Sequence, residues 1–409
     1  MQDFDYLSSS NHYFDSACQS LRPQPVIDSL TNYYTQHNSC GERVKYNWGR
    51  ITDEKVAATR AKILDFLKLK KRDYSVSFTL NTTYGINLLL SQFNPQKAQI
   101  TQIITSDIEH NSPFLASMSF AKTNHLPRKV ISRQPDGSIN LSDLEPNSLV
   151  VVNCASNFDG RKLQNIKEFI KTVHKSGGYV IIDAAQAMAH CSDLLHKTDA
   201  DAICFSAHKM YAPSLGVIVI KKSFLKFIDT NFIGGGMVDD VNRDTYLLSS
   251  DNPAQAFTKF EAGLQAWGEI IALGAAIDWL SKLPKSDHQN LANNTSELFN
   301  FLKSHPKIHL INQTKNPTMS FYVENLDSHL LGSALADENI MARTGYFWAH
   351  YYLDHVMHSP PLLHSVTTTA PKISPLSSPN STNFSAIINP WSVLLLLLSY
   401  VFFHLELLF

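Results

Sequence analysis

The chain has 409 residues, of which 44% are hydrophobic and 17% are charged, and its formal net charge is −1. This length predicts two domains, or one large domain with a smaller lobe. The 35 basic and 36 acidic residues form no basic stripe, which argues against nucleic acid as a partner. The five cysteines show no CxxC pair or disulfide-like spacing, and we expect no signal peptide, so a reducing, cytoplasmic location is predicted.

Short apolar runs rich in Val, Ile or Phe alternate with amphipathic segments through the middle of the chain. Strands are predicted over 75–80, 102–105, 149–153, 179–183, 202–206 and 217–221. Helices are predicted over 83–93 and 163–176, where apolar residues recur at helical spacing. This alternation predicts an α/β fold with a mostly parallel sheet that is covered on both faces.

Polar or ionisable residues follow five of these strands. They are Asn81, Thr82, Thr83 and Tyr84, then Asp107, Glu109, His110 and Asn111, then Ser156 and Asn157, then Asp183 and Gln186, and finally Ser206, His208 and Lys209. Any single strand end is often polar for no functional reason. Because ligands bind outside the carboxyl ends of parallel strands, five such ends together indicate one binding site.

The residue types at these ends suggest a particular chemistry. Thr82 and Thr83 open a predicted helix and suit a phosphate group, although one of them could serve only as the helix N-cap. Asp183 at a buried strand end is costly unless it meets a cation or several hydrogen-bond donors, and a protonated pyridine nitrogen would be such a partner. Lys209 is either a surface turn residue or a cleft lysine that can form a Schiff base. Together these groups describe a pyridoxal phosphate site, and no metal site is predicted.

Eight short motifs occur along the chain in a characteristic order: NTTYGINLL, SDIEHNS, NCASNFDG, IIDAAQAMAH, FSAHKMYAP, GGGM, FEAG and ENIMARTG. With them, the chain resembles the class V aminotransferase superfamily, in its cysteine desulfurase and selenocysteine lyase branch, from residue 13 to about residue 363. The resemblance implies the pyridoxal-phosphate-dependent transferase fold, similar to aspartate aminotransferase. That fold has a large domain with a mainly parallel seven-stranded sheet and a smaller C-terminal α+β domain.

The resemblance also implies a division of the chain and a dimer. Residues 1–25 would pack on the small domain, 26–270 would form the large cofactor-binding domain, and 271–363 would form a small domain that is truncated. Residues 364–409 would be an aberrant tail. The site of this family lies at a subunit interface, so a homodimer is expected.

The resemblance assigns roles to the strand-end residues. Lys209 would be the Schiff-base lysine and proton shuttle, Asp183 would keep the pyridine nitrogen protonated, and His110 would stack on the pyridine ring. Asn157 and Gln186 would lie near the phenolic oxygen. The phosphate cup would consist of Thr82, Thr83, Ser206 and His208. Arg43 and Arg343 are weaker candidates for binding a substrate.

Two departures from the family bear on activity. Trp348 occupies the position of the family's catalytic cysteine, and no cysteine lies beyond Cys204, so no nearby thiol is expected to replace it. This argues against persulfide formation but not against a lyase or a transaminase. Leu264 stands where the family often has a threonine that reaches the partner subunit's phosphate.

The C-terminal segment departs most. The family's carboxylate-binding arginine is absent after residue 363, and a Ser/Thr/Pro-rich stretch leads into a leucine-rich end, 391–409. In a reading frame shifted by one base, codons compatible with the residues from His364 onward could encode the missing family motif. Our hypothesis is therefore a frameshift near His364. The alternative is a membrane tether through 391–409, and membrane contact is expected only if this tail inserts.

The leading prediction is a pyridoxal-phosphate-dependent enzyme that acts on a small amino acid or amine, as a lyase, a desulfurase-like enzyme or a transaminase. One alternative is a degenerate cofactor-binding relative with little activity, because of Trp348 and the lost arginine. The other alternative is the membrane-tethered form.

Overall fold

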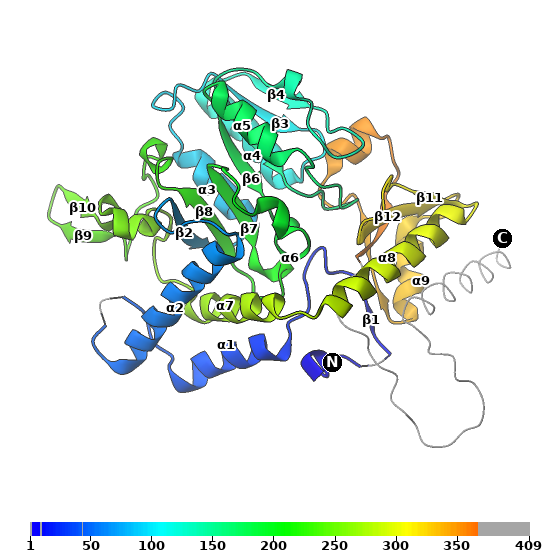
Figure 1. The fold of residues 1–409 in the computed structure, drawn as a ribbon, viewed down its shortest axis with the longest axis horizontal. Helices are drawn as coiled ribbons and strands as arrows, with labels where there is room; N and C mark the ends of the chain where they lie inside the picture. The colour runs from blue at the N-terminus through cyan, green and yellow to red at the C-terminus, as the bar shows by residue number, and fades with distance from the viewer. Residues whose placement is uncertain (1, 9, 43, 367–409) are drawn as a thin grey trace.

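The computed structural model describes residues 2–8, 10–42 and 44–366 (Figure 1). Its centre is a seven-stranded sheet in the order β2-β8-β7-β6-β5-β3-β4. The strands are β2 (Tyr74–Thr79), β3 (Gln102–Ser106), β4 (Arg128–Ile131), β5 (Ser148–Asn153), β6 (Tyr179–Asp183), β7 (Ala202–Ser206) and β8 (Gly216–Lys221). Five neighbouring strands, β4, β3, β5, β6 and β7, run parallel, whereas β8 runs antiparallel to β7 and to β2. The predicted α/β fold with a mainly parallel seven-stranded sheet is confirmed.

Helices cover both faces of this sheet because its strands are apolar on both sides. Alternate residues of β5 show the pattern: Val150 and Val152 join the core under α1 (Gln24–Gln36), α2 (Asn47–Phe66), α5 (Ile166–Lys175) and α7 (Trp267–Ser281). Leu149 and Val151 join the opposite core, under α3 (Thr82–Gln92) and α4 (Asn111–Asn124). A further short helix, α6 (Ala187–His190), follows β6. Consecutive strand residues point to opposite faces, so both layers are buried as predicted.

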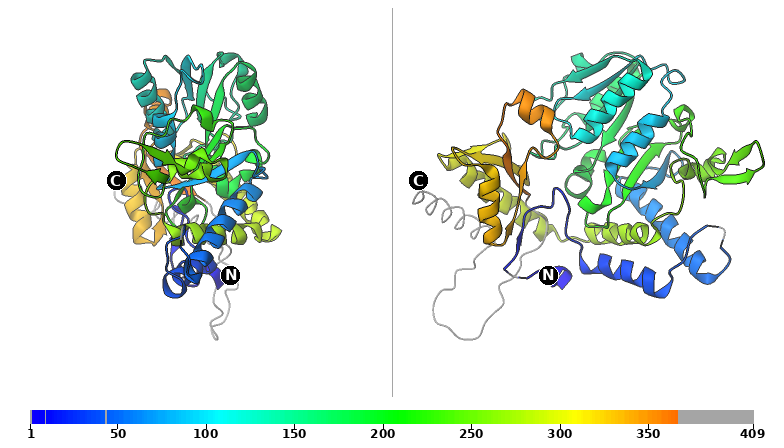
Figure 2. Two further views of the ribbon diagram at one scale, coloured as in Figure 1. Left: turned by 90° about the vertical axis from the view of Figure 1, so that its left-hand side faces the viewer. Right: turned by 180° about the vertical axis from the view of Figure 1, so that it is seen from behind.

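A second, smaller sheet lies at one end of the molecule, in the order β11-β12-β15-β14 (Figure 2). Its strands are β11 (Ile308–Leu310), β12 (Thr318–Val323), β14 (Arg343–Gly345) and β15 (Leu362–Val366), all in antiparallel pairs. The helices α8 (Lys285–Ser304) and α9 (Ser328–Asp337) supply apolar residues to the core of this sheet. The division of the chain into four segments stays a prediction.

Two strand pairs lie outside the main sheets. β1 (His12–Tyr13) pairs in parallel with β13 (Ile340–Met341), which fixes the N-terminal segment beside the small sheet. β9 (Val238–Val241) and β10 (Tyr246–Leu248) form a hairpin that projects from the opposite end of the molecule (Figure 1).

Among the residues that the structure describes, no helix has both the length and the apolar character that a membrane crossing needs. The segment 391–409, on which the predicted membrane tether rests, lies outside the described residues, as does most of the tail of the frameshift hypothesis.

Candidate active site

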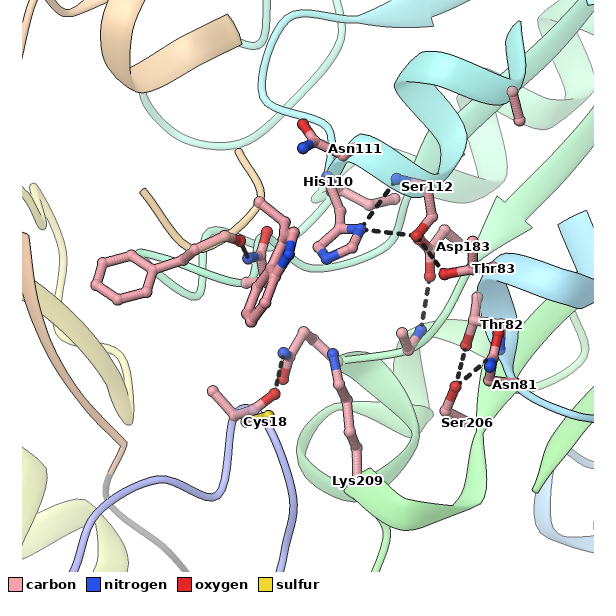
Figure 3. Close-up of a pocket in the computed structure, with 18 of the residues that line it drawn as sticks. Cys18, Asn81, Thr82, Thr83, His110, Asn111, Ser112, Asp183, Ser206 and Lys209 are labelled. Carbon is pink, nitrogen blue, oxygen red and sulfur yellow. Dashed lines mark hydrogen bonds between the residues drawn. The ribbon is translucent and has the colours of Figure 1, made fainter. Parts of the chain in front are cut away.

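The carboxyl ends of five strands of the large sheet meet at one cavity of about 680 Å³ (Figure 3). Its polar lining from the sheet side consists of Asn81, Thr82, Thr83, Asn87, His110, Asn111, Ser112, Ser119, Asn153, Asn157, Asp183, Gln186, Ser206, His208 and Lys209. The other side is formed by Ala17 and Cys18 of the N-terminal segment and by Arg343, Phe347 and Trp348. We call the first set the sheet wall and the second set the facing wall.

One end of the sheet wall is a helix N-terminus with several hydroxyl groups. Asn81 caps α3, because its side-chain oxygen accepts a hydrogen bond from the Tyr84 backbone N–H at 2.9 Å. Thr82 is therefore not the N-cap of α3, and its hydroxyl lies 2.6 Å from the hydroxyl of Ser206. The Thr82 backbone N–H donates to the same Ser206 oxygen at 2.8 Å. Hydroxyls gathered at the positive end of a helix are suited to an anion such as a phosphate.

His110 begins α4 and is held as a neutral ring. Its Nδ1 accepts a hydrogen bond from the Ser112 backbone N–H at 3.0 Å and lies 2.8 Å from the Ser112 hydroxyl. That hydroxyl is in turn 2.6 Å from the hydroxyl of Thr83. Burial, and next the positive charges of Lys209 and His350, lower the pKa of His110 to about 3. An imidazole in this state offers a neutral face to a ligand over the physiological pH range.

Asp183 and Lys209 place opposite charges on the floor of the cavity. Asp183 ends β6, is 4% exposed, and accepts a hydrogen bond from the Ala185 N–H at 2.9 Å. Burial raises the pKa of Asp183, while that hydrogen bond and the charge of Lys209 oppose the rise. Burial also lowers the pKa of Lys209, and the negative charge of Asp183 opposes this effect. A lysine with a lowered pKa is more often in its neutral, nucleophilic form.

Asn157, Gln186 and His208 complete the polar lining of the sheet wall. Asn157 is 8% exposed, and its amide N–H donates to the Phe347 carbonyl at 2.5 Å. The Asn157 side-chain oxygen is buried and has no partner among the described residues, which suits a donor on a ligand. The Gln186 amide donates to the Ala17 carbonyl at 2.8 Å, so this side chain ties the two walls together. Burial lowers the pKa of His208 to about 4, and nearby cations add to this effect.

The facing wall is built around an ion pair. Arg343 of β14 donates two hydrogen bonds to the carboxylate of Asp15, at 2.8 and 2.7 Å. Its guanidinium carbon lies 5.4 Å from the ring centroid of Trp348. The Trp348 side chain is 48% exposed, and its backbone has a left-handed φ of 56°. Arg343, a weaker candidate for binding a substrate, lines the cavity. The other candidate, Arg43, lies outside the described residues.

One prediction about this wall is wrong. No thiol was expected near the site, because no cysteine follows Cys204 in the sequence. The structure brings Cys18, from the other end of the chain, into the cavity lining with Lys209. Distance along the chain was a poor guide, because the N-terminal segment returns to the site through the β1–β13 pair.

The cavity lining includes every strand-end residue to which a cofactor role was assigned, together with residues that the sequence did not single out. Those missed include Ala17, Cys18, Ser112, Asn153 and Phe347. Of these, Ser112 carried a signal, because it lies two residues after His110 at the start of α4. Within the described residues, no group of three or more His, Cys, Asp or Glu side chains could hold a metal ion.

The residues present fit pyridoxal phosphate. A helix N-terminus with hydroxyl groups suits the phosphate, a buried carboxylate suits the pyridine nitrogen, and a cavity lysine suits the aldehyde. The unpartnered oxygen of Asn157 leaves one further place for a ligand donor. When it is bound, this cofactor supplies an electron sink for negative charge that develops on an amino acid substrate.

Comparison with known proteins identifies the class. The family model for aminotransferase class V matches residues 12–362, so the chain belongs to the class V aminotransferase family. A probable cysteine desulfurase from Haemophilus influenzae is 30% identical over 350 residues, which cover 83% of this chain and 78% of that protein. A probable cysteine desulfurase from Pyrococcus abyssi is 29% identical over 348 residues, covering 82% and 84% of the two chains.

Solved structures agree in fold. The cysteine desulfurase CsdA (S-sulfonic acid) from Escherichia coli superimposes with a TM-score of 0.78 at 22% identity, covering 90% of this chain and 92% of that chain. The apo cysteine desulfurase from Thermococcus onnurineus NA1 gives a TM-score of 0.76 at 25% identity, covering 89% and 91%.

Class V aminotransferases depend on pyridoxal phosphate, so the chain is a pyridoxal-phosphate-dependent enzyme of the cysteine desulfurase-like type. The predicted family, fold and cofactor are confirmed. The comparisons do not support the alternative of a degenerate relative.

Proposed function

We propose that this enzyme transforms a small amino acid or amine in the cavity between the two walls, by elimination or by amino-group transfer. The observation that carries the proposal is that Lys209, Asp183 and the N-terminus of α3 line one cavity. These are the three groups that the aldehyde, the pyridine nitrogen and the phosphate of the cofactor require.

The residues of the sheet wall would divide the work as follows. Lys209 would bind the cofactor's aldehyde covalently and later move a proton to or from the substrate. Asp183 would keep the pyridine nitrogen protonated, and its burial strengthens that interaction. His110, whose ring is neutral, would stack on the pyridine. Asn157 and Gln186 would lie beside the phenolic oxygen, where the free oxygen of Asn157 can accept a hydrogen bond.

The phosphate would be held by four residues at the other end of the sheet wall. The proposed contacts are Thr82, Thr83, Ser206 and His208. Support comes from the short contact between the hydroxyls of Thr82 and Ser206 at the start of α3, and from the cavity position of His208. Arg343 would help to position the substrate, because its guanidinium lies at the facing wall.

We also propose that two copies form a homodimer in the cytoplasm. Large apolar side chains that do not line the cavity are exposed, among them Leu80 at 68%, Leu264 at 78% and Val241 of the β9–β10 hairpin at 60%. A second copy could bury them, as expected for an obligate interface. The free cysteines Cys18 and Cys40 are consistent with a reducing compartment. Sedimentation of the holoenzyme would give the mass of a dimer, and a monomer at micromolar concentration would contradict this part.

The cofactor roles are tested by Lys209→Ala. We expect purified holoenzyme to show the visible absorption band of a lysine-bound cofactor, and the variant to lose that band. Lys171 on α5 is exposed and outside the cavity, so Lys171→Ala serves as the matched control and keeps the band. Circular dichroism checks that both variants are folded. A band that survives in Lys209→Ala after gel filtration would contradict the assignment.

A further inference from the structure

Two large apolar side chains line the cavity and are nevertheless exposed. Trp348 of the facing wall is 48% exposed, and Leu115 on α4 is 54% exposed. None of the proposed cofactor contacts uses either residue. Because removing apolar area from water is favourable, large apolar side chains that are left open inside a cavity point to a ligand with an apolar part.

The indole of Trp348 is held in a fixed place. The Asn111 N–H donates to the Trp348 carbonyl at 2.6 Å, and the Asn157 amide donates to the carbonyl of the preceding Phe347 at 2.5 Å. The ring centroids of Trp348 and His110 lie 6.2 Å apart, with 34° between the ring planes. Since His110 is the proposed cover of the pyridine ring, the side chain of a substrate joined to the cofactor would come within reach of the indole.

Most polar groups of the facing wall already have partners. The carbonyls of Ala17, Phe347 and Trp348 each accept a hydrogen bond from the sheet wall. Arg343 donates from two of its nitrogens to Asp15, so its charge is paired, although its third nitrogen can still hold a carboxylate. Little polar capacity is therefore left on this wall for the side chain of a substrate.

The charges around the cavity also restrict that side chain. Of the residues that the structure places in the cavity lining, only Asp183, Lys209 and Arg343 carry a full charge, because the two histidines there are neutral. Asp183 and Lys209 are proposed to bind the cofactor, and Arg343 is paired with Asp15. A basic or acidic substrate side chain would therefore lose its hydration without gaining a partner.

We propose that the substrate carries an aromatic side chain and that Trp348 is the residue that selects it. Aromatic rings in offset or edge-to-face contact attract each other more strongly than the buried area alone provides. Leu115 would add apolar contact, and the third nitrogen of Arg343 would hold a carboxylate. The inference rests on the proposed function, which it narrows to amino acids or amines with an aromatic ring.

The experiment uses the full-length holoenzyme and the shift of its visible cofactor band on titration with L-phenylalanine, L-serine or L-aspartate. L-Phenylalanine should reach half of the full shift at a concentration roughly 10-fold or more below that of the other two. Trp348→Ala should lose most of this preference. Trp348→Phe should retain most of it, because it keeps an aromatic ring at the same position.

Two matched variants control for the loss of an exposed apolar side chain. Trp48 on α2 is also 48% exposed but does not line the cavity, so Trp48→Ala should keep the wild-type preference. Met118 on α4 is 45% exposed and likewise outside the lining. Leu115→Ala should reduce the preference by a smaller factor than Trp348→Ala does, whereas Met118→Ala should not change it.

Three results would overturn the inference. The first is a half-point for L-serine or L-aspartate at or below that for L-phenylalanine. The second is an unchanged preference in Trp348→Ala. The third is a loss in Trp348→Ala that is equal for all three amino acids, which would assign the indole a structural role only.

Absence of the cofactor band in wild type would instead defeat the proposed function. Calorimetric titration with 3-phenylpropionate then still decides the role of the indole, because this probe has the ring and the carboxylate of phenylalanine but no amino group to react with an aldehyde. Binding that Trp348→Ala weakens roughly 10-fold and Trp48→Ala does not weaken supports the inference. No binding to wild type, or equal binding in both variants, overturns it.

Discussion

The two walls of the cavity are built in different ways. The sheet wall consists of the ends of neighbouring strands, and the proposed cofactor-binding side chains end a strand or follow it within four residues. The facing wall joins Asp15 to Arg343 across 328 residues of sequence. Where the chain resembles its family most, at the sheet wall, local geometry places the side chains. Where it departs, at Trp348, the position depends on long-range contacts. The difference suggests that the cofactor chemistry resides in the sheet wall and the choice of substrate in the facing wall.

The largest effect should come from the sheet wall, at Asp183. Replacing it in Asp183→Asn removes the buried negative charge that faces the proposed pyridinium. The loss of one partner of a buried ion pair is worth about 3–5 kcal/mol, so we expect cofactor affinity to fall by roughly 10²-fold or more. Titration of the apoprotein with pyridoxal phosphate measures this. Asp278→Asn, at a half-exposed aspartate paired with Lys62, is the control and should bind normally. Equal affinity in both variants would assign the cofactor to some other site.

The second prediction concerns the buried support behind the sheet wall. Burial raises the pKa of Glu109 to about 8 from an ordinary value of 4.5. Because the folded pKa is the higher one, the contribution of Glu109 to stability is complete below about pH 4.5 and is lost as the pH rises through 8. In Glu109→Gln, which mimics the protonated form, this loss should disappear, a difference on the order of 5 kcal/mol between the two ends of the range.

Urea unfolding at a series of pH values measures that difference. The exposed Glu297 on α8 gives the matched variant, Glu297→Gln, whose pH dependence should follow that of wild type. If Glu109→Gln destabilises the protein equally at all pH values, then Glu109 is ionised in the folded state and the sign of the prediction is wrong.

On the facing wall, Arg343→Ala should have a smaller and different effect. It removes two hydrogen bonds from a charged donor to Asp15, each worth about 1.5–3 kcal/mol when buried and less at this partly exposed position. We expect KM for the substrate to rise about 10-fold while the cofactor band is retained, since the sheet wall is untouched. A double-mutant cycle with Asp15→Ala tests whether the effect passes through this pair. Loss of the cofactor band would mean that the two walls do not act separately.

The smallest expected effect is at Trp348. Its left-handed backbone suits glycine better than alanine, since a Cβ in that conformation costs roughly 1–2 kcal/mol. Trp348→Gly should therefore be about 1 kcal/mol more stable than Trp348→Ala, measured by thermal unfolding. Both variants lose the same indole from the cavity, so both should keep the cofactor band and change KM by a similar factor. If the order of stability is reversed, the backbone at Trp348 is not left-handed.

Much of the sheet wall could be predicted from the sequence. Buried parallel strands read as apolar runs, and the polar residue that follows such a run marks the edge where ligands bind. β4 was missed because Arg128–Ile131 is short, and only Ile131 of its four residues is fully buried. The alternative that a threonine only caps α3 is wrong, because Asn81 takes that role. The facing wall could not be predicted in the same way, since no local pattern shows that Cys18 and Arg343 share a cavity.

The segment from His12 to Ser20 has a mechanical consequence. One end is joined to the small sheet through β13 and Arg343, and the other end is joined to the backbone on both sides of Lys209. Such a segment couples the small sheet to the backbone around Lys209. A small rotation of the small sheet relative to the large one would be passed through this segment to the floor of the cavity. The enzyme could therefore adjust the space between the two walls without moving any strand of the central sheet.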